Sequence, residues 1–165
     1  MATSSANFLQ LVSSPAKFRL FMLAKLPMAY LAGLRIKAVS PDHAAVTISY
    51  KYLNKNPFNS IYFACLSMAA ELSTGVLCMM HVYKSNPSVS MLVVNLEADF
   101  TKKAVGKITF SCHDGQMIQE AADRTKQTGE GVTFTATSIG IDEKGDQVAA
   151  FRFTWSMKAK NKRQV

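Results

Sequence analysis

Cysteine is scarce in this sequence and follows no metal-binding or disulfide pattern. The three cysteines are Cys65, Cys78 and Cys112, an odd number without a CxxC pair or Cys/His spacing. A disulfide framework and a zinc site are therefore not expected, and no other metal is implied. A reducing cytoplasm is the compartment that this cysteine usage favours.

The motifs of several common enzyme classes are also absent. The chain contains no Walker loop, GxGxxG, GxSxG or HExxH. Nucleoside-triphosphate, dinucleotide, serine-hydrolase and zinc-protease chemistry therefore have no support. The histidines, His43, His81 and His113, stand apart, and each is expected to be a surface or hydrogen-bonded polar residue rather than a catalyst.

Acidic residues are few: 11 Asp and Glu stand against 19 Lys and Arg, which leaves a net charge of +8. This surplus favours an anionic partner, either nucleic acid, a phosphorylated small molecule or an acidic membrane surface. Nucleic acid is not expected, because no RNP-like aromatic strand or arginine-rich recognition helix is present. The N-terminal region lacks acids, yet no short apolar segment precedes an AxA cleavage pattern, so a targeting peptide is not expected.

The length of 165 residues, 48% of them hydrophobic, predicts one domain over 1–165. Its core should be large enough to be stable without a disulfide or a structural metal. Helical spacing predicts an amphipathic helix over 7–26, within an N-terminal helical segment 1–30. Ser14 and Pro15 interrupt this helix, and Pro27 ends it. Period-two alternation predicts strands, and a polar stretch predicts a short helix over 116–126. The predicted strands are 34–39, 44–52, 89–100, 105–114, 131–141 and 147–157. Residues 158–165 are expected to form a solvated basic tail.

The segment 59–84 is apolar on every side, and Glu71 is its only charged residue before Lys84. A helix of this kind is wrapped by protein or set in lipid. The run 61–80 has membrane-spanning length, but a carboxylate near its centre would be costly there, so stable membrane insertion is not expected. The order of elements instead predicts an α+β domain, in which a six-stranded antiparallel curved sheet surrounds this long central helix.

Glu71 is the residue that most requires an explanation. An ionised carboxylate inside an apolar helix costs several kcal/mol unless it is paired or reaches water. Burial raises the pKa of such a group toward the range useful for a general base. A buried ion pair or a water-filled dimer seam would explain it equally well.

The entry to the helix is the second feature. Asn59 or Ser60 is expected to be the N-cap, and a helix N-terminus offers unpaired N–H groups to a carbonyl or an anion. Capping alone would explain these residues, but Asn56 and Glu71 place an amide and a carboxylate in the same loop-helix unit.

These residues resemble the hotdog-fold thioesterase superfamily, in particular the small acyl-CoA thioesterase branch that includes the phenylacetate-pathway enzymes, and within it an uncharacterised bacterial subfamily. In those enzymes a loop Asn precedes a His-Gly-Gly helix entry, and the helix carries an Asp or Glu further on. An ungapped match from Asn56 to Glu71 puts Asn56 on the family Asn and Glu71 on the acid. Tyr62 then falls on the His, and Phe63 and Ala64 on the glycines.

The resemblance implies hydrolysis of an acyl-CoA thioester in a homodimer, or a dimer of such dimers, with coenzyme A as part of the substrate and no other cofactor. Glu71 would be the general base or the nucleophile, and Asn56 would orient water or substrate. Tyr62 and the N–H groups near Phe63 and Ala64 would hold the thioester oxygen. Further substrate-binding candidates are two residues of the helix entry and two cations, namely Asn59, Ser60, Lys102 and Lys103.

Two departures from the family pattern bear on activity. Phe63 and Ala64 replace glycines that allow the backbone to approach a ligand, which narrows the oxyanion site. The alternative is therefore a non-catalytic acyl-thioester or lipid-binding hotdog protein. Because no His lies in the loop-helix unit, dehydration chemistry is less expected than hydrolysis or binding.

Overall fold

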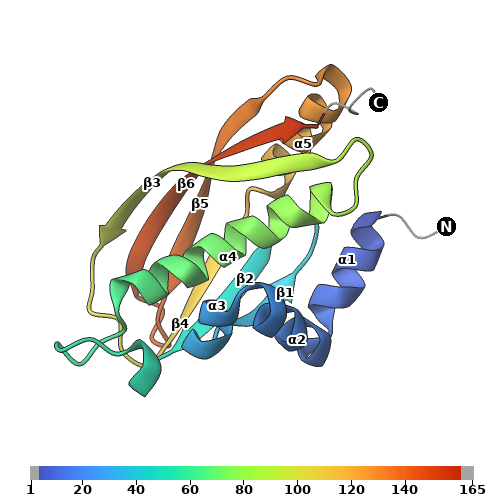
Figure 1. Ribbon diagram of the computed structural model, residues 1–165. Coiled ribbons are helices and arrows are strands. Elements are labelled where there is room, and N and C mark those ends of the chain that lie inside the picture. The colour runs from blue at the N-terminus through green and yellow to red at the C-terminus, as the bar shows by residue number, and fades with distance from the viewer. Residues whose placement is uncertain (1–3, 161–165) are drawn as a thin grey trace.

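The computed structural model describes residues 4–160. Six strands form one antiparallel sheet that curls around the helix α4 (Figure 1). The helical elements are α1 (Ser4–Ser13), α2 (Pro15–Lys25), α3 (Pro27–Ala32), the 3-10 turn η1 (Tyr52–Asn54), α4 (Phe63–Val82) and α5 (Gly115–Thr128). The strands are β1 (Arg35–Val39), β2 (Ala44–Ser49), β3 (Val89–Phe100), β4 (Lys107–Cys112), β5 (Val132–Ile141) and β6 (Gln147–Ala159).

The strand order is β1-β2-β4-β5-β6-β3, so β1 and β3 are the two edges of the sheet. The helix α4 lies across the inner face and packs against β2, β4, β5 and β6. The predicted α+β architecture, a six-stranded antiparallel curved sheet around a long central helix, is confirmed.

The apolar character of α4 is explained by this wrapping. This helix is long and apolar enough to span a membrane, but 67% of the 18-residue apolar stretch within it is buried inside the protein. Leu66, Leu77 and Met80 on this helix are almost completely buried. The sheet, rather than lipid, therefore accounts for the lack of a polar face.

The N-terminal helices confirm one prediction and correct another. The helical segment is interrupted at Ser14, which has an extended backbone, and Pro15 takes the first position of α2, as predicted. Pro27 does not end the helical segment, because it begins α3. Within the predicted amphipathic helix, Leu20 and Leu23 do not face the core, since both side chains are exposed.

The C-terminal prediction is also corrected. Strand β6 continues to Ala159, which pairs with Val89, and Lys158 pairs with Ser90. The basic tail therefore does not begin at Lys158, because the long edge strand β3 offers backbone partners to the end of β6. Residues 161–165 of the predicted tail lie outside the described residues.

Candidate active site

The loop before α4 is organised by the side chain of Asn56. Its Oδ1 accepts hydrogen bonds from the backbone N–H of Phe58 at 2.9 Å and of Ser60 at 3.2 Å. Its Nδ2 donates to the Ser60 hydroxyl at 3.0 Å. The amide therefore holds the loop in shape, as Asn side chains do in tight turns.

The helix begins later than the sequence predicts. Tyr62 occupies the N-cap position, and its side chain makes no capping hydrogen bond. The prediction that Asn59 or Ser60 caps the helix is wrong, because Asn56 ties Ser60 into the loop and Asn59 adopts a left-handed backbone with φ 57°. The N–H groups of Phe63 and Ala64 donate to no described residue, so they are free to face a ligand.

A cavity of about 290 Å³ opens at this helix entry. It brings together most of the residues proposed from the sequence, whereas Asn59 and Ala64 do not line it. The proposed residues on its wall are Asn56, Ser60, Tyr62, Phe63, Lys102 and Lys103. The Phe63 ring packs on Tyr62 with 4.9 Å between ring centroids and on Phe100 with 6.4 Å. An aromatic wall therefore stands where the resemblance implies glycine.

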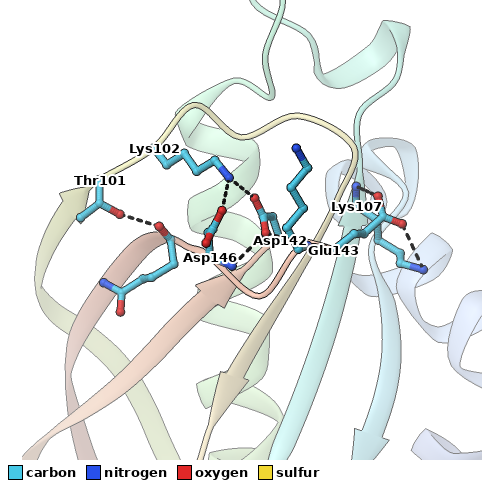
Figure 2. A network of polar contacts seen from close by, with 8 residues as sticks. Thr101, Lys102, Lys107, Asp142, Glu143 and Asp146 are labelled. Atoms are coloured by element: carbon cyan, nitrogen blue, oxygen red, sulfur yellow. Dashed lines mark hydrogen bonds and ion pairs between the residues drawn. The ribbon is translucent and has the colours of Figure 1, made fainter.

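The two lysines of this cavity differ in their surroundings. Lys102 Nζ lies 2.6 Å from a carboxylate oxygen of Asp142 and 2.6 Å from one of Asp146, in the turn between β5 and β6 (Figure 2). Hydrogen bonds to these two carboxylates raise the pKa of Lys102. Lys103 is exposed and pairs with no described residue. Of the two ammonium groups, that of Lys103 is the more available to an anionic ligand.

Glu71 lies elsewhere, eight residues beyond Phe63 and therefore about 12 Å along the helix axis. It borders a second cavity, of about 280 Å³, between α4 and the junction of α2 and α3. The residues on its wall are Lys25, Leu26, Pro27, Met28, Ala29, Met68, Glu71 and Leu72. Sequence reasoning missed the contribution of the N-terminal helices, because no local pattern links Leu26 or Met28 to a residue on α4.

The carboxylate of Glu71 is unpaired within residues 4–160. No described side chain gives it an ion pair or a hydrogen bond, although Lys25 borders the same cavity. Burial raises the pKa of Glu71. A buried ion pair therefore does not explain why the apolar helix α4 carries a carboxylate at Glu71.

Gly75, one turn beyond, leaves room for the carboxylate. A Cβ at this position would lie 3.2 Å from Oε1 of Glu71 and 3.7 Å from the Trp155 ring. Any larger side chain here would push against the carboxylate.

The histidines take no part in either cavity. The rings of His43 and His113 stack at 4.6 Å, and His81 lies near the end of α4 with a buried Nε2 that has no partner among the described atoms. Within residues 4–160 no cluster of His, Cys, Asp and Glu is suited to a metal. The arrangement therefore offers a carboxylate with a raised pKa and a helix entry with free N–H groups, placed in separate cavities.

Solved structures share this fold at low sequence identity. A probable thioesterase from Pseudomonas aeruginosa is 19% identical, with 89% of this chain and 97% of the other covered and a TM-score of 0.73. A thioesterase from Haemophilus influenzae is 12% identical, with 92% and 95% covered and a TM-score of 0.66. The E. coli PaaI protein from the phenylacetic acid degradation operon is 14% identical, with 92% and 96% covered and a TM-score of 0.63.

These likenesses confirm the predicted hotdog fold. No curated protein matches the chain. A family model described as a domain of unknown function, DUF4442, matches residues 15–157. Because this match spans most of the sequence, the chain belongs to the DUF4442 family.

Proposed function

We propose that this protein hydrolyses an acyl-CoA thioester and that Glu71 is its catalytic carboxylate. The observation that carries the proposal is the unpaired carboxylate on the central helix, which borders a cavity and has its pKa raised by burial. Groups with such shifts concentrate at functional sites. The proposal is supported by the fold shared with proteins that are called thioesterases.

Glu71 has two chemical routes to this reaction. As a general base it takes a proton from water, while the water oxygen bonds to the thioester carbonyl carbon. The tetrahedral intermediate then collapses, the carbon–sulfur bond breaks, and the coenzyme A thiolate receives the proton. As a nucleophile, Glu71 displaces the thiolate to give an anhydride that water hydrolyses. Both routes require Glu71 to be ionised.

The helix entry supplies the matching electrophilic group. The free N–H groups of Phe63 and Ala64 lie at the positive end of the α4 dipole, where they stabilise a developing oxyanion. Tyr62 lines the cavity at this helix entry and adds a hydroxyl donor. We assign Asn56 a positioning role, because its amide holds the loop that leads to these donors. Lys103 is the candidate cation for the coenzyme A phosphates.

A complete site on this plan needs two protomers, since Glu71 and the helix entry open into different cavities of one chain. Strand β3 is an edge of the sheet, and its apolar side chains Leu92, Val94 and Leu96 are exposed. An apolar edge strand of this length is a surface for pairing with another chain. We therefore propose a homodimer joined along β3, in which each site combines Glu71 of one protomer with the helix entry of its partner.

One observation favours a second function, the binding of an acyl thioester without hydrolysis. The exposed ring of Phe63 packs against Tyr62 and Phe100 at the helix entry. An aromatic side chain at this position leaves less room beside the N–H groups than glycine would. A site narrowed in this way could hold a thioester without activating its carbonyl.

The two functions separate in one pair of assays on the same protein. Release of free thiol from short, medium and aromatic acyl-CoAs is measured beside calorimetric binding of the same thioesters. We expect thiol release that saturates with at least one thioester. Binding with no thiol release above the rate without protein would replace hydrolysis by the binding function, and neither binding nor release would exclude both.

A further inference from the structure

We propose that the outer face of α2 and α3 docks the protein onto an anionic lipid bilayer. This inference goes beyond thioester hydrolysis and does not depend on it. It begins with α2, which carries apolar side chains on two faces. Phe18 and Met22 are buried against the rest of the protein, whereas Leu20 and Leu23 are 68% and 50% exposed.

Exposed apolar side chains form a stripe along α2. Ala16, Leu20, Leu23 and Ala24 recur at helical spacing, and all four are exposed. Apolar side chains are exposed on α3 as well, at Met28, which is 65% exposed, and at Leu31, which is 49% exposed. These six residues are called the outer stripe below. Single exposed apolar residues need no explanation, but a row of them on two consecutive helices indicates a surface that contacts something apolar.

Cations border the outer stripe on α2, and neither α2 nor α3 carries an acidic residue. Helical geometry places Lys17 on one side of Leu20 and Arg19 on the other side of Leu23, and Lys25 follows at the end of α2. No acidic residue precedes Asp42 in the sequence. An apolar face rimmed by Lys and Arg is the pattern of helices that lie in the interface of a membrane, where the long cationic side chains reach the headgroups.

A second feature next to α2 also suits anionic headgroups. A cavity of about 370 Å³ lies between α1, α2 and the edge strand β1. Arg19, Arg35 and Lys37 line it, and no carboxylate does. A phosphate at this position would meet guanidinium and ammonium groups without a competing negative charge.

The same charges argue against a second copy of the chain as the occupant. A symmetric contact through the outer stripe would bring Lys17, Arg19 and Lys25 against their own copies, which repel. The edge proposed for dimer pairing, β3, lies at the other end of the strand order from β1, beside which α1 and α2 pack. Figure 1 shows α1, α2 and α3 on one side of α4 and β3 on the other. A dimer along β3 therefore leaves the outer stripe open.

Docking in this orientation would have a consequence for the site, one that rests on the proposed function. Leu26 and Met28 line the cavity that Glu71 borders, so the opening of this cavity adjoins the membrane-facing surface. An acyl group could then pass from the bilayer interface to the carboxylate without crossing bulk water.

The test is cosedimentation of the full chain with vesicles of phosphatidylcholine alone or mixed with phosphatidylglycerol. We expect binding to the mixed vesicles that weakens as salt is added, and weak binding to phosphatidylcholine. The variant Leu20→Ser/Leu23→Ser should lose at least roughly tenfold in vesicle binding, because it removes the apolar contact. The matched control Leu53→Ser/Val105→Ser, which changes exposed residues outside the outer stripe, should bind as the unmodified protein does.

A charge series separates docking from unspecific attraction. Lys17→Gln/Lys25→Gln should lose roughly fivefold in binding per removed charge, whereas Lys144→Gln/Lys160→Gln should lose less. Four results would overturn the proposal: no vesicle binding, equal binding by the leucine variant and its control, equal losses in both lysine pairs, or a lower oligomeric state in the leucine variant, which would make the outer stripe a contact between copies. Thermal melts confirm that each variant folds. Because no step of this test uses a thioester, its failure leaves the proposed hydrolysis intact.

Discussion

The indole Nε1 of Trp155 donates a hydrogen bond of 3.1 Å to the hydroxyl of Thr74, and both side chains are buried. The Thr74 hydroxyl in turn donates to the backbone carbonyl of Glu71 at 2.9 Å. Strand β6 and helix α4 are therefore joined at the helical turn that carries the proposed catalytic carboxylate. Trp155 and Thr74 therefore fix the position of this turn.

Replacing Thr74 by Val tests this connection. The variant keeps the shape of the side chain but leaves the buried indole N–H without an acceptor, so unfolding free energy should fall by about 1–3 kcal/mol. Thr135→Val is the control, because Thr135 is exposed and its bond to Thr154 is open to water. Denaturant melts of both variants give the comparison. Equal losses would show that the buried bond adds nothing.

Gly75→Ala separates stability from activity. Alanine favours the helix by about 1 kcal/mol relative to glycine. Its Cβ would stand 3.2 Å from Oε1 of Glu71, so the carboxylate must shift to make room. We expect an unchanged or higher Tm together with a lower kcat in thiol release. A variant with full activity would show that the space beside Glu71 is not needed.

Stability should also depend on the charge of Glu71. Burial raises its pKa above the ordinary value of 4.5, so the folded chain binds this proton more tightly than the unfolded chain. The stability that the folded chain gains from this tighter proton binding is therefore complete below pH 4.5. It is lost as pH rises through the raised pKa of Glu71. Glu71→Gln should raise Tm at mildly alkaline pH and change it little in acid. A lower Tm of the variant at alkaline pH would reveal a stabilising partner for the carboxylate.

The proposed dimer is tested at the edge strand. Val94→Lys places a charge on the exposed apolar row of β3, where edge lysines block pairing between chains. We expect a monomer in analytical ultracentrifugation and a loss of thiol release, because each site would lose its second half. Val105→Lys, on an exposed residue outside the strands, is the control. An active monomer would show that one chain holds a whole site.

The fold was largely predictable, because its main feature is visible locally. A helix that is apolar on every side needs a sheet around it, and period-two strands flank it in the sequence. Glu71 was identified as the exception to that pattern. The prediction of the helix start was wrong because Asn59 and Ser60 have the chemistry of caps, but Asn56 binds this segment into a loop.

What the sequence could not reveal are contacts between distant segments. Lys102 carries an ammonium group that could bind phosphate, yet in the structure this group pairs with Asp142 and Asp146 of the β5–β6 turn (Figure 2). The cavity beside Glu71 depends on Leu26 and Met28, far away in the chain. The spacing of Leu20 and Leu23 gives the face of the helix but not which of two apolar faces is turned inward.

The most direct test of the account is thiol release from acyl-CoAs by Glu71→Gln beside Glu130→Gln. Glu130 is exposed and lies outside both cavities, so its variant controls for the loss of a charge. We expect Glu71→Gln to lower kcat/KM by about 10²–10⁴-fold, as removal of a general base does, while Glu130→Gln keeps full activity. A Glu71→Gln variant that hydrolyses the same thioesters as fast as the unmodified protein would contradict the assignment of Glu71.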